Sequence, residues 1–108
     1  MSRMIRIESL LKQQISLIIQ KDFRSNLGLI SIIGIRLSKD LSNATIIYSH
    51  MGSPTEQKKS LQKLQKARQF IKKELGKTIR LKRIPSLTFK LNDALEKGSN
   101  IVNQIKTL

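Results

Sequence analysis

Apolar residues recur at helical spacing through the first 22 residues. One face carries Met4, Ile7, Leu11, Ile15 and Ile18. Polar and charged residues occupy the other faces, as in an amphipathic helix with one buried stripe. The segment DFRSNLG then favours a turn through its Asn, Ser and Gly residues. The pattern therefore predicts a helix that ends near residue 22.

The spacing next changes to alternation, which predicts a pair of strands. The segment LISIIGIRLS, residues 29–38, is rich in β-branched residues. Alternation places Leu29, Ile33, Ile35 and Leu37 on one face and Ile30, Ile32, Gly34 and Arg36 on the other, and one of the two faces is expected to be buried. Gly34 is expected to mark a β-bulge or a close backbone approach. ATIIYS follows after KDLSN, so we expect a hairpin with a loop of about five residues.

A helix start is encoded in SPTE. Ser53 is the expected N-cap, Pro54 the first helical residue and Glu56 the partner in a capping box. The face expected to point inward holds Leu61, Leu64, Ala67, Ile71 and Leu75. Gly76 is the expected end of this helix.

A third strand and a last helix complete the chain. Pro85 excludes helix in KTIRLKRIP, and Leu87, Phe89 and Leu91 then alternate with polar residues. The apolar spacing after Asp93 predicts a short C-terminal helix. The order α-β-β-α-β-α predicts a single domain, residues 1–108, folded as a two-layer α+β sandwich with a three-stranded sheet.

The net charge of the chain indicates what kind of partner it binds. The chain has 21 Lys and Arg residues against 7 Asp and Glu residues, a net charge of +14. The window from residue 58 to residue 83 contains one acid, Glu74, and eleven cations: Lys58, Lys59, Lys63, Lys66, Arg68, Lys72, Lys73, Lys77, Arg80, Lys82 and Arg83. A surface that is only solvated usually mixes positive and negative side chains. A cluster of cations instead favours binding to phosphates, because each contact releases condensed counterions. We therefore predict that these eleven residues bind nucleic acid.

Other chemistry has little support in the sequence. The single histidine, His50, lacks a partner in a recognisable motif, so we expect a surface side chain without a catalytic role. The acids are scattered, there is no cysteine, and no nucleotide-binding motif occurs, so no metal, cofactor or small-molecule substrate is predicted. No apolar run is long enough to span a membrane. Phe70 and Phe89 are expected in the core, which favours contact with phosphates over stacking of unpaired bases.

Three segments together resemble the ribosome-binding factor A family. They are RLSKDLSNATIIYS, LQKARQFIKKELGKTIRLKRIPSLTF and DALEKGSNI, in that order, and the resemblance covers almost the whole chain. It implies a KH-like type II fold, α-β-β-α-(kink)-α-β, in which the middle helix is broken. The implied kink falls at Ala67, Arg68 and Gln69, where this chain has no glycine, so a milder bend or none is expected.

The resemblance also implies a function. Members assist assembly of the small ribosomal subunit: they bind the immature particle through its rRNA and favour maturation of the 5′ end of the small-subunit rRNA, without enzymatic activity. A monomeric, cytoplasmic protein is expected. A resident ribosomal protein or general KH-type RNA-binding protein is the alternative, and an RNA-processing enzyme is a third possibility for which the sequence supplies no active site.

Overall fold

The computed structural model describes residues 3–23 and 30–92 of the chain. Five elements follow one another: α1 (Arg3–Asp22), β1 (Ile30–Leu37), β2 (Asn43–His50), α2 (Pro54–Thr78) and β3 (Ser86–Leu91). The predicted α+β sandwich with a three-stranded sheet is confirmed. The predicted C-terminal helix lies outside the described residues.

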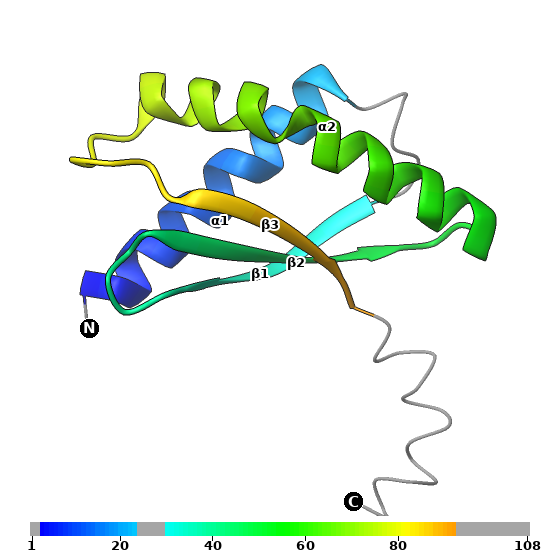
Figure 1. Ribbon diagram of the computed structural model, residues 1–108, viewed down its shortest axis with the longest axis horizontal. Helices are drawn as coiled ribbons and strands as arrows, with labels where there is room; N and C mark the ends of the chain where they lie inside the picture. The colour runs from blue at the N-terminus through cyan, green and yellow to red at the C-terminus, as the bar shows by residue number, and fades with distance from the viewer. Residues whose placement is uncertain (1–2, 24–29, 93–108) are drawn as a thin grey trace, which may run out of the picture.

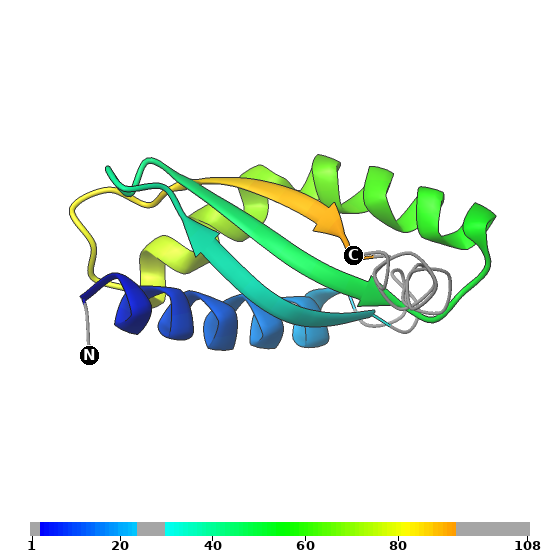
Figure 2. The ribbon, with the colours of Figure 1, turned by 90° about the horizontal axis from the view of Figure 1, so that it is seen from below.

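The strands lie side by side in the order β1-β2-β3. β1 and β2 form the expected antiparallel hairpin, whereas β3 runs parallel to β2. A parallel pair needs a crossover connection, and α2 supplies it (Figure 1). Viewed from below, both helices lie behind the sheet (Figure 2), with α1 against β1 and α2 against β3. One face of the sheet therefore packs on the helices, and the other faces away from both.

The core fills the space between the two helices and the sheet. The most deeply buried side chains are Tyr48, Leu11, Ile15, Ile46, Leu64, Ile71, Leu75 and Pro85. Leu87 and Phe89 add the inner face of β3, as their alternation predicts. Tyr48 and Phe89 meet edge to face, with ring centroids 6.5 Å apart. The apolar stripes of both helices are thus the buried ones.

The bulge expected at Gly34 is present, and it changes which residues of β1 share a face. Pairing with β2 shifts between Ile32 and Gly34. The extra residue reverses the alternation, so Ile32 packs toward the core before the bulge and Ile35 after it. Ile33, expected on the same face as Ile35, is 43% exposed, whereas Ile35 is buried. Leu29 lies outside the described residues.

Helix α2 begins as predicted and ends later. The Ser53 hydroxyl accepts the Glu56 N–H at 3.2 Å, and the Glu56 carboxylate accepts the Ser53 N–H at 2.8 Å, which completes the capping box. The helix continues two residues beyond Gly76 to Thr78, because a glycine can remain helical when the next turn is held. The Ile79 N–H bonds to the Leu75 carbonyl at 2.8 Å and closes that turn.

The division of α2 into two helices, which the resemblance implied, is absent. α2 is helical throughout its 25 residues, including Ala67, Arg68 and Gln69. Figure 1 shows it curving over the sheet without a break. Gln69 has an ordinary helix propensity and lacks the freedom that glycine would give the backbone, which accounts for the continuity.

Candidate RNA-binding surface

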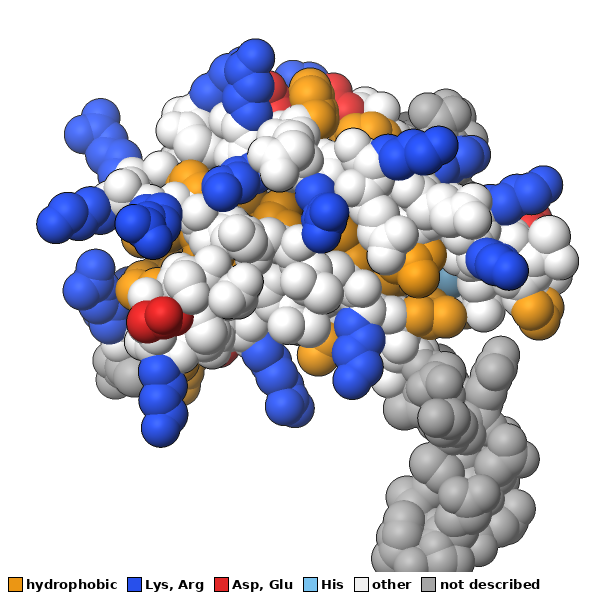
Figure 3. Space-filling view, in the orientation of Figure 1, with side chains coloured by type: hydrophobic (Ala, Val, Ile, Leu, Met, Phe, Trp, Pro, Cys, Tyr) orange, Lys and Arg blue, Asp and Glu red, His pale blue; other side chains and the backbone are white. Residues whose placement is uncertain are grey.

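The predicted cations lie on the outside of α2 and of the connection that follows it. Ten of the eleven are exposed, and Lys72 is half-buried. Figure 3 shows basic side chains over the part of the surface that α2 forms and at the edge where the α2–β3 connection lies. The structure separates them into three groups, and Lys58 lies apart from these near the start of α2.

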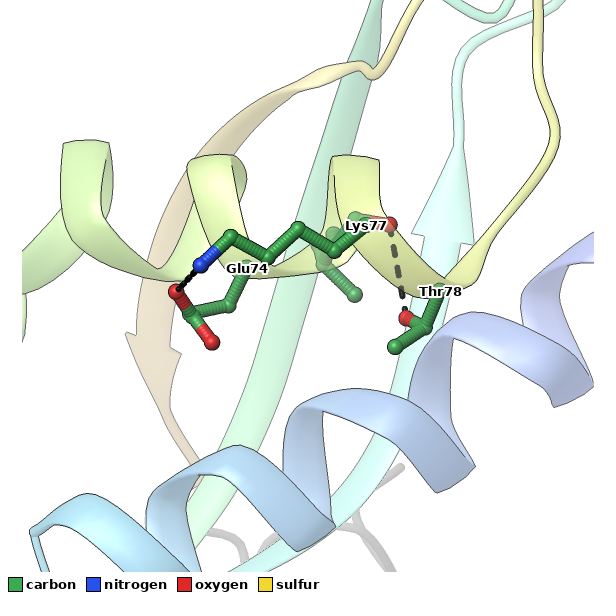
Figure 4. A network of polar contacts seen from close by, with 4 residues as sticks. Glu74, Lys77 and Thr78 are labelled. Atoms are coloured by element: carbon green, nitrogen blue, oxygen red, sulfur yellow. Dashed lines mark hydrogen bonds and ion pairs between the residues drawn. The ribbon is translucent and has the colours of Figure 1, made fainter.

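The first group is a lysine stripe along α2, made of Lys59, Lys63, Lys66, Lys73 and Lys77. These positions, with Phe70 in the middle, recur every three or four residues, so they share one side of the helix. Glu74 neutralises the far end, since its carboxylate lies 3.0 Å from the Lys77 ammonium group (Figure 4). Lys66 and Lys73, on either side of Phe70, are exposed.

The second group lies between α2 and the start of β3. Arg68 and Lys72 line a small hollow of about 120 Å³, together with Gln69, Ser86 and Leu87. The Arg68 guanidinium donates to the Gln65 carbonyl one turn earlier at 3.3 Å, which holds the side chain along the helix surface. This pair can present two cations to a chain of phosphates that crosses the helix.

The third group surrounds a larger hollow of about 550 Å³, which we call the connection pocket. Lys82 and Arg83 line it from the α2–β3 connection. Arg3, at the start of α1, lines it from the opposite side and was missed by the sequence reasoning. The apolar part of the lining is Ile7, Leu41, Leu81 and Pro85. Arg80 is exposed in the same connection. Three cations around an apolar floor favour an anionic ligand.

One acid, Asp40, lies at the rim of the connection pocket and is fixed by the hairpin turn. Its Oδ1 accepts the Ser42 hydroxyl at 2.7 Å, the Ser38 hydroxyl at 2.8 Å and the Ser42 N–H at 3.0 Å. These bonds lower the pKa of Asp40 to about 2. Leu41 adopts a positive φ of 62° within this turn. Asp40 is therefore ionised at neutral pH, and its hydrogen bonds fix the turn that places Leu41 in the pocket lining.

His50 has a structural role that the sequence reasoning did not predict. It is half-buried rather than a surface side chain. Its Nδ1 accepts the Gly52 N–H at 2.9 Å, and its Nε2 lies 2.9 Å from the hydroxyl of buried Ser60. The ring thereby joins the end of β2 to the first turns of α2. This contact sets where the lysine stripe begins.

The acids are used mostly by the fold. Glu8 accepts the Leu37 N–H at 2.9 Å, and Glu56 and Asp40 are held by their own turns. The Glu56 carboxylate has a lowered pKa, mainly because of its bonds to Ser53. Glu74 forms an ion pair with Lys77, and Lys59 attracts the Glu56 carboxylate. The positive field over α2 and the connection is thus little compensated from within.

The described residues hold no group of three or more His, Asp or Glu side chains placed to bind a metal ion. Within the same residues no helix is both long and apolar enough to cross a membrane.

Comparison with known proteins decides the family. The family model for ribosome-binding factor A matches residues 3–105. The chain belongs to the ribosome-binding factor A family. Family members similar to it include those of Dictyoglomus thermophilum, 39% identical with 98% of this chain and 90% of the relative covered, and of a Synechocystis strain, 34% identical with 98% and 82% covered.

Solved structures of the family share the fold. The crystal structure of ribosome-binding factor A from Thermus thermophilus is 25% identical, with a TM-score of 0.74 over 82% of this chain and 93% of that one. A homology model of the Thermus factor, fitted into the cryo-EM map of a 30S–RbfA complex, gives a TM-score of 0.70 at 26% identity, over 82% of this chain and 93% of that one. The resemblance noted from the sequence is confirmed.

Proposed function

We propose that this protein binds the immature small ribosomal subunit through its rRNA and assists maturation of the 5′ end of that rRNA. It acts by binding, as a cytoplasmic monomer, and catalyses no step itself. The observation that carries the proposal is the distribution of charge. Ten of eleven clustered cations are exposed, and the described acids mostly serve the fold.

The phosphate contacts are assigned to the same eleven residues, with Arg3 added. Each cation placed on a phosphate releases condensed counterions, so a surface of this kind binds RNA strongly at low salt and weakly at high salt. A helix that carries a continuous lysine stripe fits the backbone of folded RNA, whose shape and phosphates are the features that proteins usually recognise. Membership of the family, and the relative fitted into a 30S complex, make the small subunit the favoured RNA.

Sedimentation of the tagged protein through a sucrose gradient tests this proposal. An assembly factor is expected with free small subunits and precursor particles, and depleted from translating ribosomes. The alternative, a resident ribosomal protein, predicts the tag in polysomes and its retention on mature subunits after a high-salt wash. Equal distribution along the gradient, independent of subunits, would contradict both and favour a general RNA-binding protein.

A further inference from the structure

Phe70 lies on the surface, although its apolar character predicted a place in the core. The side chain is 42% exposed in the middle of the lysine stripe. Its ring meets that of half-buried Phe23, at the end of α1, edge to face with centroids 5.7 Å apart and planes at 82°. Such a pair holds the Phe70 ring in place while leaving much of it open to solvent.

The surroundings of this ring distinguish it from an ordinary exposed apolar residue. Single exposed apolar side chains are common and need no explanation. Here, however, Lys66 precedes the ring by one helical turn and Lys73 follows it by one turn on the same stripe. A surface hollow of about 450 Å³ lies alongside, lined by Phe23, Lys63, Lys66 and Ala67. The site combines a fixed aromatic ring, a hollow and cations on both sides.

We propose that Phe70, supported by Phe23, is a stacking platform for an unpaired RNA base. Every base has a π face, so an exposed ring binds unpaired bases with little regard to sequence. Lys66 and Lys73 lie about 10 Å apart along the helix axis and contact the phosphates on either side of the stacked nucleotide. This inference rests on the proposed RNA-binding function and adds single-stranded RNA to the phosphate backbone as its ligand.

Charge selects RNA over a protein as the occupant. A protein partner that buried Phe70 would also have to desolvate or neutralise the lysines on both sides of the ring. An RNA strand brings both a base for the ring and phosphates for the lysines on either side of it. The proposal therefore commits to an unpaired nucleotide, and a ribosomal protein becomes an outcome of the test.

The test compares the full-length protein with Phe70→Leu and Phe70→Tyr on two probes at one salt concentration. The probes are a short single-stranded oligoribonucleotide that contains 2-aminopurine and an RNA duplex of equal length. Phe70→Leu is expected to weaken single-strand binding by about 5- to 150-fold and to abolish quenching of the fluorescent base. Duplex binding should stay within about twofold, because phosphate contacts dominate it. Phe70→Tyr retains the ring and is expected to retain both activities.

A matched control makes the same substitution in the core. Phe89 is 6% exposed and cannot stack on a base without unfolding. Phe89→Leu is therefore expected to lower the melting temperature and to leave the ratio of single-strand to duplex affinity unchanged. Neutralising Lys66 and Lys73 to Gln should weaken binding to both probes.

The outcomes separate this proposal from the proposed function. Normal single-strand binding by Phe70→Leu, with both probes weakened by the lysine variant, would overturn the platform and leave RNA binding intact. Equal losses on both probes would also overturn it. Normal binding of both probes with lost binding to small subunits would place Phe70 against a ribosomal protein. If the unaltered protein bound neither probe nor small subunits, the proposed function itself would fail.

Discussion

Neutralising two cations of the connection pocket should weaken small-subunit binding without changing the fold. Lys82 and Arg83 are exposed, and within residues 3–23 and 30–92 neither has an ion-pair partner. Replacing both with Gln removes two phosphate contacts, so the slope of log affinity against log salt should fall by about 1.8. If this contribution vanishes near 1 M salt, binding at 0.1 M weakens by about 60-fold. The melting temperature should hardly change, because exposed substitutions away from packing cost little.

The assay is co-sedimentation with purified small subunits over a series of salt concentrations, alongside thermal melts. The matched control is Lys12→Gln with Lys21→Gln, which lowers the net charge equally on exposed positions of α1. If contact is local, the control should keep nearly the full slope. Leu87→Ala is the stability control: it removes a residue that is 4% exposed and should cost about 2–5 kcal/mol of folding free energy.

Two results would refute this reasoning. If the Lys82/Arg83 and Lys12/Lys21 double variants weakened binding equally, net charge alone would drive association with the subunit. The connection pocket would then not be a preferred contact site. An unchanged slope in a folded Lys82→Gln, Arg83→Gln variant would mean that this pocket is a solvated surface. The RNA face would then lie along the lysine stripe or beyond it.

Three further predictions concern the fold that carries the surface. Tyr48→Phe should raise the free energy of unfolding by about 1–3 kcal/mol in denaturant melts, because the buried Tyr48 hydroxyl has no hydrogen-bond partner among the described residues; a loss of stability would show that it is satisfied. Gly52→Ala should destabilise by about 1–3 kcal/mol, since the new Cβ would lie 2.6 Å from the His50 ring, whereas Gly34→Ala meets nothing within 4 Å; equal melting temperatures for the two variants would contradict this. The pKa of Asp40 is lowered to about 2, so its charge stabilises the fold above the unfolded pKa near 4, and that stabilisation is lost as pH falls toward 2. The unaltered protein should therefore melt higher than Asp40→Asn near neutral pH, and this difference should shrink between pH 4 and pH 2. A constant difference in melting temperature from pH 6 to pH 2 would exclude a stabilising role for the Asp40 charge.

Local patterns predicted the elements well, because each depends on residues close in sequence. The capping box is an example, since two residues only three positions apart, Ser53 and Glu56, specify it. The alternation of β3 is another, since Pro85 separates it from the preceding helix. The end of α2 was less predictable: whether a helix continues past Gly76 depends on what holds its last turn.

The errors came from features that sequence spacing cannot specify. A bulge reverses alternation at a point that only strand pairing determines, so Ile33 was wrongly grouped on one face with Ile35. His50 and Ser60 are ten residues apart, and their contact depends on how α2 packs against the end of β2. Arg3 lines the connection pocket only because the packing of α1 places its first residue beside the α2–β3 connection. Phe70 is apolar and adjacent in sequence to Ile71 of the buried stripe. Only the packed structure shows that it lies at the edge of that stripe.

The placement of the acids explains how one small chain combines its fold with a largely uncompensated positive surface. Mutual repulsion among the cations opposes folding, and internal ion pairs would relieve it at the cost of blocking phosphate contacts. The protein instead places Glu8, Asp40 and Glu56 against backbone N–H groups, where each stabilises an edge strand, a turn or a helix start. Those bonds contribute to folding without covering the cations of α2. The cations therefore still repel one another in the free protein, and bound RNA would remove that repulsion. Because the repulsion is largest at low salt, RNA binding should raise the melting temperature most there.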